Sequence, residues 1–134
     1  MFKLIKIMNS GVNVPEPVML QKGEREISRG EALVLTAGKA TPCGTTTAPT
    51  HIALANAEVT DTAIACMAIS PNMVFECPIT EGSPTLLTVG TKVCLTQKSG
   101  KTVGINGTTT SGVATVHDTL GATLVGDKVL ITFR

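Results

Sequence analysis

Three segments of this 134-residue chain share one pattern: a glycine, two variable residues, an aliphatic residue, any residue, a second aliphatic residue and a threonine. They span residues 30–36, 90–96 and 126–132. Glycine adopts turn conformations that other residues resist, and side chains two positions apart point to the same face of a strand. The pattern predicts three turns that each lead into a half-buried strand. A chance origin in a chain rich in Gly, Thr and Val is the alternative.

The first two segments are followed by Gly38-Lys39 and Gly100-Lys101, which predict the tips of two hairpins. The three segments begin 60 and 36 residues apart. This irregular spacing excludes a solenoid or a propeller, whose repeats have a fixed period.

The composition indicates the same class of fold. The chain has 21 threonines, 43% hydrophobic residues, 16% charged residues and 2% aromatic residues. β-Branched residues favour strands, whereas helical bundles are rich in Glu, Lys and Leu, and disordered chains are polar and charged. We therefore predict an all-β domain, a small β-barrel or sandwich-like fold of about 9–10 short strands.

Further strands are expected between the glycine-led segments. Pro71-Asn72 predicts a turn that joins its two flanking strands in a hairpin. Residues 56–67 contain enough alanine to permit a helix, but Val59, Thr60 and Ile64 lower the helix propensity, so we prefer a strand there. The expected strands are 50–54, 62–70, 73–79, 86–89, 103–105, 113–117 and 129–133.

The N-terminal residues differ from the rest. Residues 2–8 resemble an edge strand, and Pro15 and Pro17 exclude a central strand because proline lacks a backbone donor. We expect residues 1–26 to form an extended arm or edge element, more loosely joined to the core, and residues 27–134 to form one domain.

The charge and the apolar runs of the chain exclude nucleic acid and membranes as partners. The net charge is +1, whereas nucleic-acid binding proteins usually carry a basic excess together with aromatic stacking residues. The longest unbroken apolar run, residues 63–69, is far shorter than the roughly 20 residues of a membrane helix. The N-terminus is a poor signal peptide. We expect no nucleic acid, no membrane and a location inside a cell.

The chain has four cysteines, Cys43, Cys66, Cys77 and Cys94. No two of them form a C-x-x-C pair, so zinc-ribbon and thioredoxin-like sites are not predicted. Reduced, mostly buried thiols are expected. A Cys66–Cys77 disulfide within a hairpin is the competing interpretation.

Catalytic and metal-binding patterns are weak. His51 and His117 are the two imidazoles, and adjacent residues such as His117 and Asp118 point to opposite faces of a strand. A hydrolase site would have to be formed by His51, His117 and Asp118 together with Cys43. The carboxylates around Glu31 alternate with arginines, as on a solvated face. We expect no enzyme, no cofactor and no metal site.

The low charge suggests that neutral surface is covered by another chain, since the centres of protein interfaces are poor in charged residues. A family resemblance points the same way, and it is carried by residues 27–42, 50–54, 62–70, 73–79 and 126–133. Their order, with a Gly-Glu-Ala-Leu segment, a Gly-Lys turn and a His-Ile-Ala-Leu strand, resembles the small capsid decoration (cement) proteins of tailed bacteriophages. The resemblance covers about residues 27–134.

The resemblance implies a compact β-barrel-like domain that assembles in the host cytoplasm and sits on the exterior of the virion capsid. Such proteins commonly bind the major capsid protein as homotrimers and stabilise the shell, and they carry no catalytic residues. The arm is then the expected capsid-binding element, through Val14, Pro15, Pro17, Val18, Met19 and Leu20.

A small intracellular β-barrel binding module, of a chaperonin-cofactor-like or carrier-like kind, is the alternative. Carriers usually show a modified lysine at a hairpin tip beside methionine, and neither Lys39 nor Lys101 has an adjacent methionine.

Overall fold

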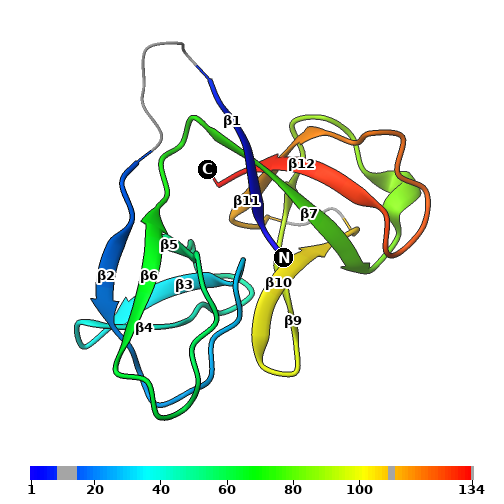
Figure 1. Ribbon diagram of the computed structural model, residues 1–134. Coiled ribbons are helices and arrows are strands. Elements are labelled where there is room, and N and C mark those ends of the chain that lie inside the picture. Colours follow the sequence, from blue (N-terminus) through cyan, green and yellow to red (C-terminus); the bar gives the residue numbers. More distant parts are fainter. Residues whose placement is uncertain (9–14, 109–110, 134) are drawn as a thin grey trace.

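A computed structural model describes residues 1–8, 15–108 and 111–133, which form two β-sheets (Figure 1). The strands are β1 (Lys3–Ile7), β2 (Val18–Gln21), β3 (Ala32–Thr36), β4 (Lys39–Pro42), β5 (His51–Ala53), β6 (Ala63–Ala68), β7 (Met73–Glu81), β8 (Lys92–Val93), β9 (Leu95–Lys98), β10 (Lys101–Asn106), β11 (Ala114–Asp118) and β12 (Lys128–Thr132). A short 3-10 helix, η1 (Pro84–Leu86), lies between β7 and β8. The prediction of an all-β, sandwich-like fold is confirmed.

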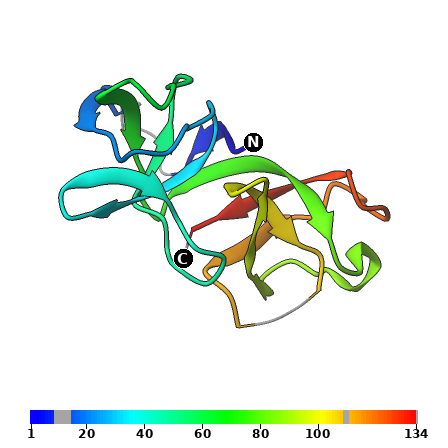
Figure 2. The ribbon, with the colours of Figure 1, turned by 90° about the horizontal axis from the view of Figure 1, so that it is seen from below.

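The larger sheet has seven strands in the order β8-β11-β12-β7-β10-β9, and β1 also pairs with β7. The pairing of β7 with β10 is parallel and the others are antiparallel. The smaller sheet is antiparallel, in the order β2-β6-β5-β3-β4. A bridge between Lys22 and Ala40 brings the chain after β2 beside β4, so this sheet is curled. Figure 2 shows the two sheets as separate lobes.

The glycine-led segments form the predicted turns. Gly30, Gly90 and Gly126 have φ angles of 80°, 89° and 101°, in the region that favours glycine. Both predicted hairpin tips are also present, between β3 and β4 and between β9 and β10. At the first tip Ala37 and Gly38 both have positive φ, which matches the type I′ turn that suits the twist of a hairpin.

The main core lies between the sheets and within the larger one. It brings together all three aromatic rings of the chain: the Phe133 ring lies 5.3 Å from that of Phe2 and 5.2 Å from that of Phe75, between centroids. The smaller sheet contributes Ala32 and Ile52 to the same core. The sequence contained no sign that residues 2, 75 and 133 would meet.

A second, smaller core lies on the opposite face of the five-stranded sheet. Strand alternation explains the division, because successive side chains point to opposite faces. Ala32 and Ile52 face the main core, while their neighbours Leu33 and Ala53 face the second core. The buried members of the second core are Ile27, Leu33, Ala40, Ala53, Ala57, Ile64 and Cys66, with Leu20 packed against them.

Two strand predictions are wrong. The strands around Pro71-Asn72 do not form a hairpin, because β6 and β7 belong to different sheets. Asn72 instead bonds Met8, the residue after β1: its carbonyl accepts the N–H of Met8 and its side-chain amide donates to the Met8 carbonyl. Residues 86–89 form no strand, because Pro84 starts η1 and its carbonyl accepts the N–H of Leu87.

The preference for a strand over a helix in residues 56–67 is confirmed. Ala57 forms an isolated bridge with Ile27, residues 59–60 form a turn, and β6 begins at Ala63.

The prediction of a loosely joined N-terminus is wrong for residues 2–7. Phe2 is buried, its N–H donates to the Gly30 carbonyl at 2.8 Å, and β1 pairs with β7. Phe2 is bulky and apolar, so its burial in the main core fixes the strand that follows it.

Candidate functional site

The proposed capsid-binding residues lie on and before β2. Val14 falls outside the described residues; Pro15 is half-buried and Pro17 is exposed. On β2 the exposed fractions of Val18 and Met19 are 40% and 68%. Leu20 is half-buried and packs against the second core. The strand therefore anchors through Leu20 and presents two apolar side chains to solvent.

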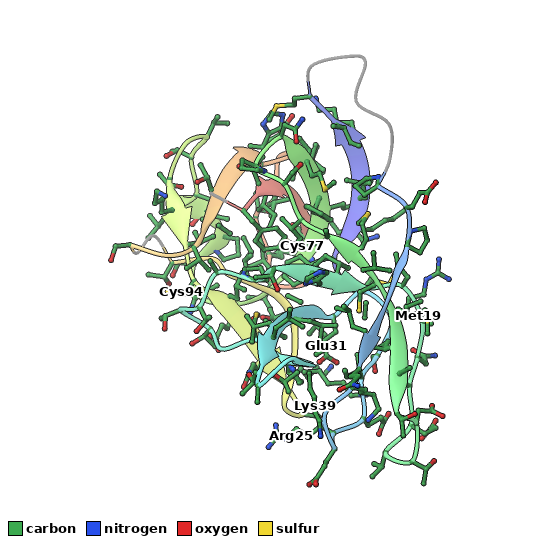
Figure 3. The ribbon with its side chains drawn as sticks, turned by 90° about the vertical axis from the view of Figure 1, so that its left-hand side faces the viewer. Met19, Arg25, Glu31, Lys39, Cys77 and Cys94 are labelled. Carbon is green, nitrogen blue, oxygen red and sulfur yellow. The ribbon has the colours of Figure 1, made fainter. Side chains whose placement is uncertain are left out.

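The outer backbone edge of β2 is paired with no described strand at Met19, but at its C-terminal end it meets β4, where the Gly23 N–H donates to the Ala40 carbonyl at 3.0 Å. β2 is the terminal strand of the described five-stranded sheet, and its inner neighbour is β6. The Lys22 N–H donates to the Thr62 carbonyl at 2.9 Å. Because antiparallel hydrogen bonding alternates along a strand, Leu20 also points its backbone groups to β6, and Met19 points its own away from β6. Figure 3 shows Met19 on this outer strand.

A buried lysine fixes the end of this edge. Lys22 is only 5% exposed, and its Nζ donates to the carbonyls of Gly23 and Arg25 at 2.7 Å each. A buried ammonium without such acceptors would be costly. Because the backbone after β2 supplies the acceptors, the lysine holds the chain in a turn at this point.

A buried carboxylate lies where the two sheets meet. Glu31 is fully buried, its Oε1 accepts the Ser28 N–H at 3.1 Å, and its Oε2 has no hydrogen-bond partner (Figure 3). Burial raises the pKa of Glu31 to about 7, against smaller lowering effects of the Ser28 N–H and of Lys101. The expectation of a solvated face is wrong for Glu31, although Arg25 is exposed as expected.

Lys101 links the sheets beside this carboxylate. Its Nζ lies 3.0 Å from the Glu26 carboxylate and also bonds the Ser28 hydroxyl. Lys101 begins β10 in the seven-stranded sheet, whereas Glu26 and Ser28 precede β3 in the five-stranded sheet. The sequence could not indicate this contact, because 75 residues separate its charged partners.

Three of the four cysteines are buried thiols with little reactivity. Cys43, Cys66 and Cys77 are buried and Cys94 is half-buried, and none of the four is in a disulfide. Cys66 lies in the second core and Cys77 in the main core, so the alternative of a Cys66–Cys77 disulfide is wrong. Burial raises the pKa of Cys43 and of Cys66 to about 11 and raises that of Cys77 further. A nucleophilic cysteine has the opposite shift.

The residues of the hydrolase interpretation lie in different sheets. His51 is on β5, with its Nδ1 2.9 Å from the Thr50 hydroxyl, and burial lowers its pKa. His117 and Asp118 are on β11, where the Asp118 carboxylate accepts the Leu120 N–H. Among residues 1–8, 15–108 and 111–133, no group of three or more His, Cys, Asp or Glu could hold a metal ion.

A second apolar surface was not predicted. Five exposed aliphatic side chains lie on two loops, 82–91 and 119–126, namely Leu86, Val89, Leu120, Leu124 and Val125. One feature of the sequence could have indicated this surface: neither loop contains a charged residue.

Comparison with known proteins finds no match to a family model, to a curated protein or to a solved structure. Within the described ranges, no helix is long and apolar enough to cross a membrane.

Proposed function

We propose that this chain is a non-enzymatic structural protein that binds the outer surface of a tailed-phage capsid and stabilises the shell. The capsid contact is the outer edge of β2 around Met19, ahead of the bridge to β4, with the exposed side chains of Val18 and Met19. The observation that carries the proposal is this edge, since an exposed strand with outward apolar side chains can add to a strand of a partner.

Two further features support the proposal. The sequence of residues 27–134 resembles capsid decoration proteins in the order of its glycine-led strands. The edge is also prepared for binding, because Leu20 and Lys22 fix β2 in an extended conformation before any partner arrives. A strand that is already ordered loses little conformational entropy on association.

The decisive experiment uses shells assembled from the major capsid protein encoded beside this chain. We expect the purified protein to co-sediment with such shells and to raise the temperature at which they disrupt. Absence of a capsid gene in the neighbourhood, or shells that leave the protein in the supernatant, would contradict the proposal and favour an intracellular binding module.

Two variants of one residue separate backbone addition from side-chain packing. Met19→Pro removes an N–H that points away from β6, so the fold should persist while strand addition is lost. Met19→Ala trims only the side chain. We expect the proline variant to bind shells about tenfold more weakly than the alanine variant. Equal binding by both variants would show that the edge backbone is not the contact.

A further inference from the structure

A cleft of about 330 Å³ lies between the start of β1 and the five-stranded sheet. This inter-sheet cleft is lined by residues 1–4 on one side and by residues 29–30, residues 52–54 and Met67 on the other. Figures 1 and 2 both show the N-terminal end of β1 at the junction of the two sheets. Small-molecule sites have volumes of roughly 300–1,000 Å³, so the cleft suits a small ligand.

The interior of the inter-sheet cleft is apolar. Phe2, Ile52 and Met67 are buried members of the main core. Leu4 and Leu54 are half-buried and pack against the same core. A hydrocarbon group that enters the cleft leaves water for these side chains, and the flexible thioether of Met67 can adapt to its shape.

The charged side chains that line the inter-sheet cleft are both cationic. Lys3 comes from β1 and Arg29 from the segment before β3, and both residues are exposed. Glu76 lies opposite Lys3 in the sheet, but its carboxylate bonds Lys128 at 3.2 Å. Within residues 1–8, 15–108 and 111–133, neither Lys3 nor Arg29 forms an ion pair. An anionic group at the mouth of the cleft would therefore meet two cations without a competing carboxylate.

The backbone beside the inter-sheet cleft already has its hydrogen bonds. The Phe2 N–H donates to the Gly30 carbonyl, and the Gly30 N–H donates to the Ala53 carbonyl, at 2.8 Å each. The Leu54 N–H donates to the Ala65 carbonyl at 2.9 Å. A peptide in the cleft would leave its own amide groups without these partners, which costs free energy. A chain of methylene groups has no such requirement.

We propose that the inter-sheet cleft binds a medium-chain aliphatic carboxylate, a fatty acid of about the size of octanoate. The hydrocarbon chain packs on Phe2, Ile52 and Met67, and the carboxylate binds Lys3 and Arg29 at the mouth of the cleft. For a ligand of about ten non-hydrogen atoms, the expected dissociation constant is about 0.1–1 mM. The inference does not depend on binding to a capsid, because no residue of β2 lines the cleft.

The test compares three probes of the same chain length on the full chain by calorimetry: octanoate, octanol and octylammonium. Octanoate is expected to bind most tightly and octylammonium least, because only the carboxylate complements the two cations. Methyl NMR of the methionines locates the ligand. Octanoate should shift the Met67 signal, whereas the Met19 signal should stay in place, because Met19 is exposed on β2 outside the cleft.

A pair of arginine variants tests the role of the charge. Arg29→Gln keeps the backbone N–H that donates to the Asn56 side chain at 2.8 Å, so the local fold should persist. It is expected to weaken octanoate binding about two- to fivefold and to leave octanol binding unchanged. Arg25→Gln is the matched control, since Arg25 is an exposed arginine of the same segment that does not line the cleft. It should bind octanoate like the wild type.

Four results would overturn the proposal. The first is no saturable binding of octanoate up to about 10 mM. The second is equal binding of octanoate and octylammonium, which would show that the cations do not select the ligand. The third is an equal effect of Arg29→Gln and Arg25→Gln, or a shift at Met19 in place of Met67, which would put the ligand elsewhere. The fourth is tighter binding of the peptide acetyl-Gly-Gly-Leu than of octanoate, which would make a peptide C-terminus the ligand.

Discussion

The two cores differ in the number and size of their buried apolar side chains. The main core contains all three phenylalanines and most of the large buried aliphatic side chains. The second core is made of three alanines and one cysteine with only three larger residues, Ile27, Leu33 and Ile64. Since hydrophobic stabilisation scales with the apolar area removed from water, the face of the five-stranded sheet that lines the second core contributes much less.

The smaller sheet also carries the costs of buried charge. Lys22 and Glu31 are both buried at its margins, and Glu31 keeps one oxygen without a hydrogen-bond partner. The five-stranded sheet therefore depends on its other face, where Ala32, Ile52 and Met67 join the main core. We expect the seven-stranded sheet to be the stable body and the sheet with the β2 edge to open first.

The largest predicted effect tests the main core. Phe75→Ala should lower the free energy of unfolding by about 3–5 kcal/mol, because Phe75 is fully buried and packs on Phe133. Urea denaturation followed by circular dichroism measures the change, and the exposed Val59→Ala variant should differ little from the wild type. A loss for Phe75→Ala below about 1.5 kcal/mol would equal the burial of only one or two methylene groups. Such a result would contradict the conclusion that the main core is the more stabilising of the two.

The second effect is a pH dependence at the junction of the sheets. The pKa of Glu31 is raised from 4.5 to about 7 in the folded state, so the folded protein binds more protons than the unfolded chain between these values. The free energy of unfolding should therefore fall by roughly 2–3 kcal/mol as the pH rises through this window, and then level off. Denaturation in urea between about pH 5 and 8 measures it.

A pair of glutamine variants assigns this pH dependence. Glu31→Gln should flatten the dependence and make the protein more stable than the wild type above the pKa of Glu31. Glu58→Gln changes an exposed carboxylate and should leave the slope as it is. A slope that survives in the Glu31→Gln variant would mean that other groups titrate on unfolding.

A smaller effect tests the second core. Ile64→Val should cost about 0.5–1.5 kcal/mol, since Ile64 is buried there and loses one methylene group. Native-state hydrogen exchange should show that the loss of protection is greatest in β2, β5 and β6. An equal loss throughout β7, β11 and β12 would show instead that the two sheets open as one unit.

The sequence predicted the local parts of this fold well. Gly30, Gly90 and Gly126 start the expected strands, and Gly38 and Gly100 form the expected tips, because turn chemistry is encoded by neighbouring residues. The partner of a strand is not encoded locally. β6 and β7 follow each other closely, yet Asn72 bonds Met8, 64 positions earlier, and the two strands separate into different sheets.

The candidate surfaces show the same limit. The prolines before β2 indicated an edge, which the sheet order confirms. The apolar surface of loops 82–91 and 119–126 depends on two segments that meet only in the folded chain, and Glu31 depends on burial by residues distant in sequence. Its neighbours Arg25, Glu26 and Arg29 are exposed, so the local charge pattern gave the wrong prediction for this buried carboxylate.

The smallest predicted effect concerns the link between the sheets. Lys101→Met removes the ion pair with Glu26 and the bond to Ser28, while it keeps the alkyl chain. The side chains of Lys101 and Glu26 are 25% and 53% exposed, and such pairs contribute about 0.2–1 kcal/mol. A double-mutant cycle with Glu26→Gln isolates the ion pair from the Ser28 bond.

If the two sheets are stabilised separately, the coupling energy between Lys101 and Glu26 should stay within about 0.2–1 kcal/mol and fall with added salt. A coupling well above 1 kcal/mol would mean that Lys101 is a major joint between the sheets, and the ranking of the two cores would then no longer predict which sheet opens first.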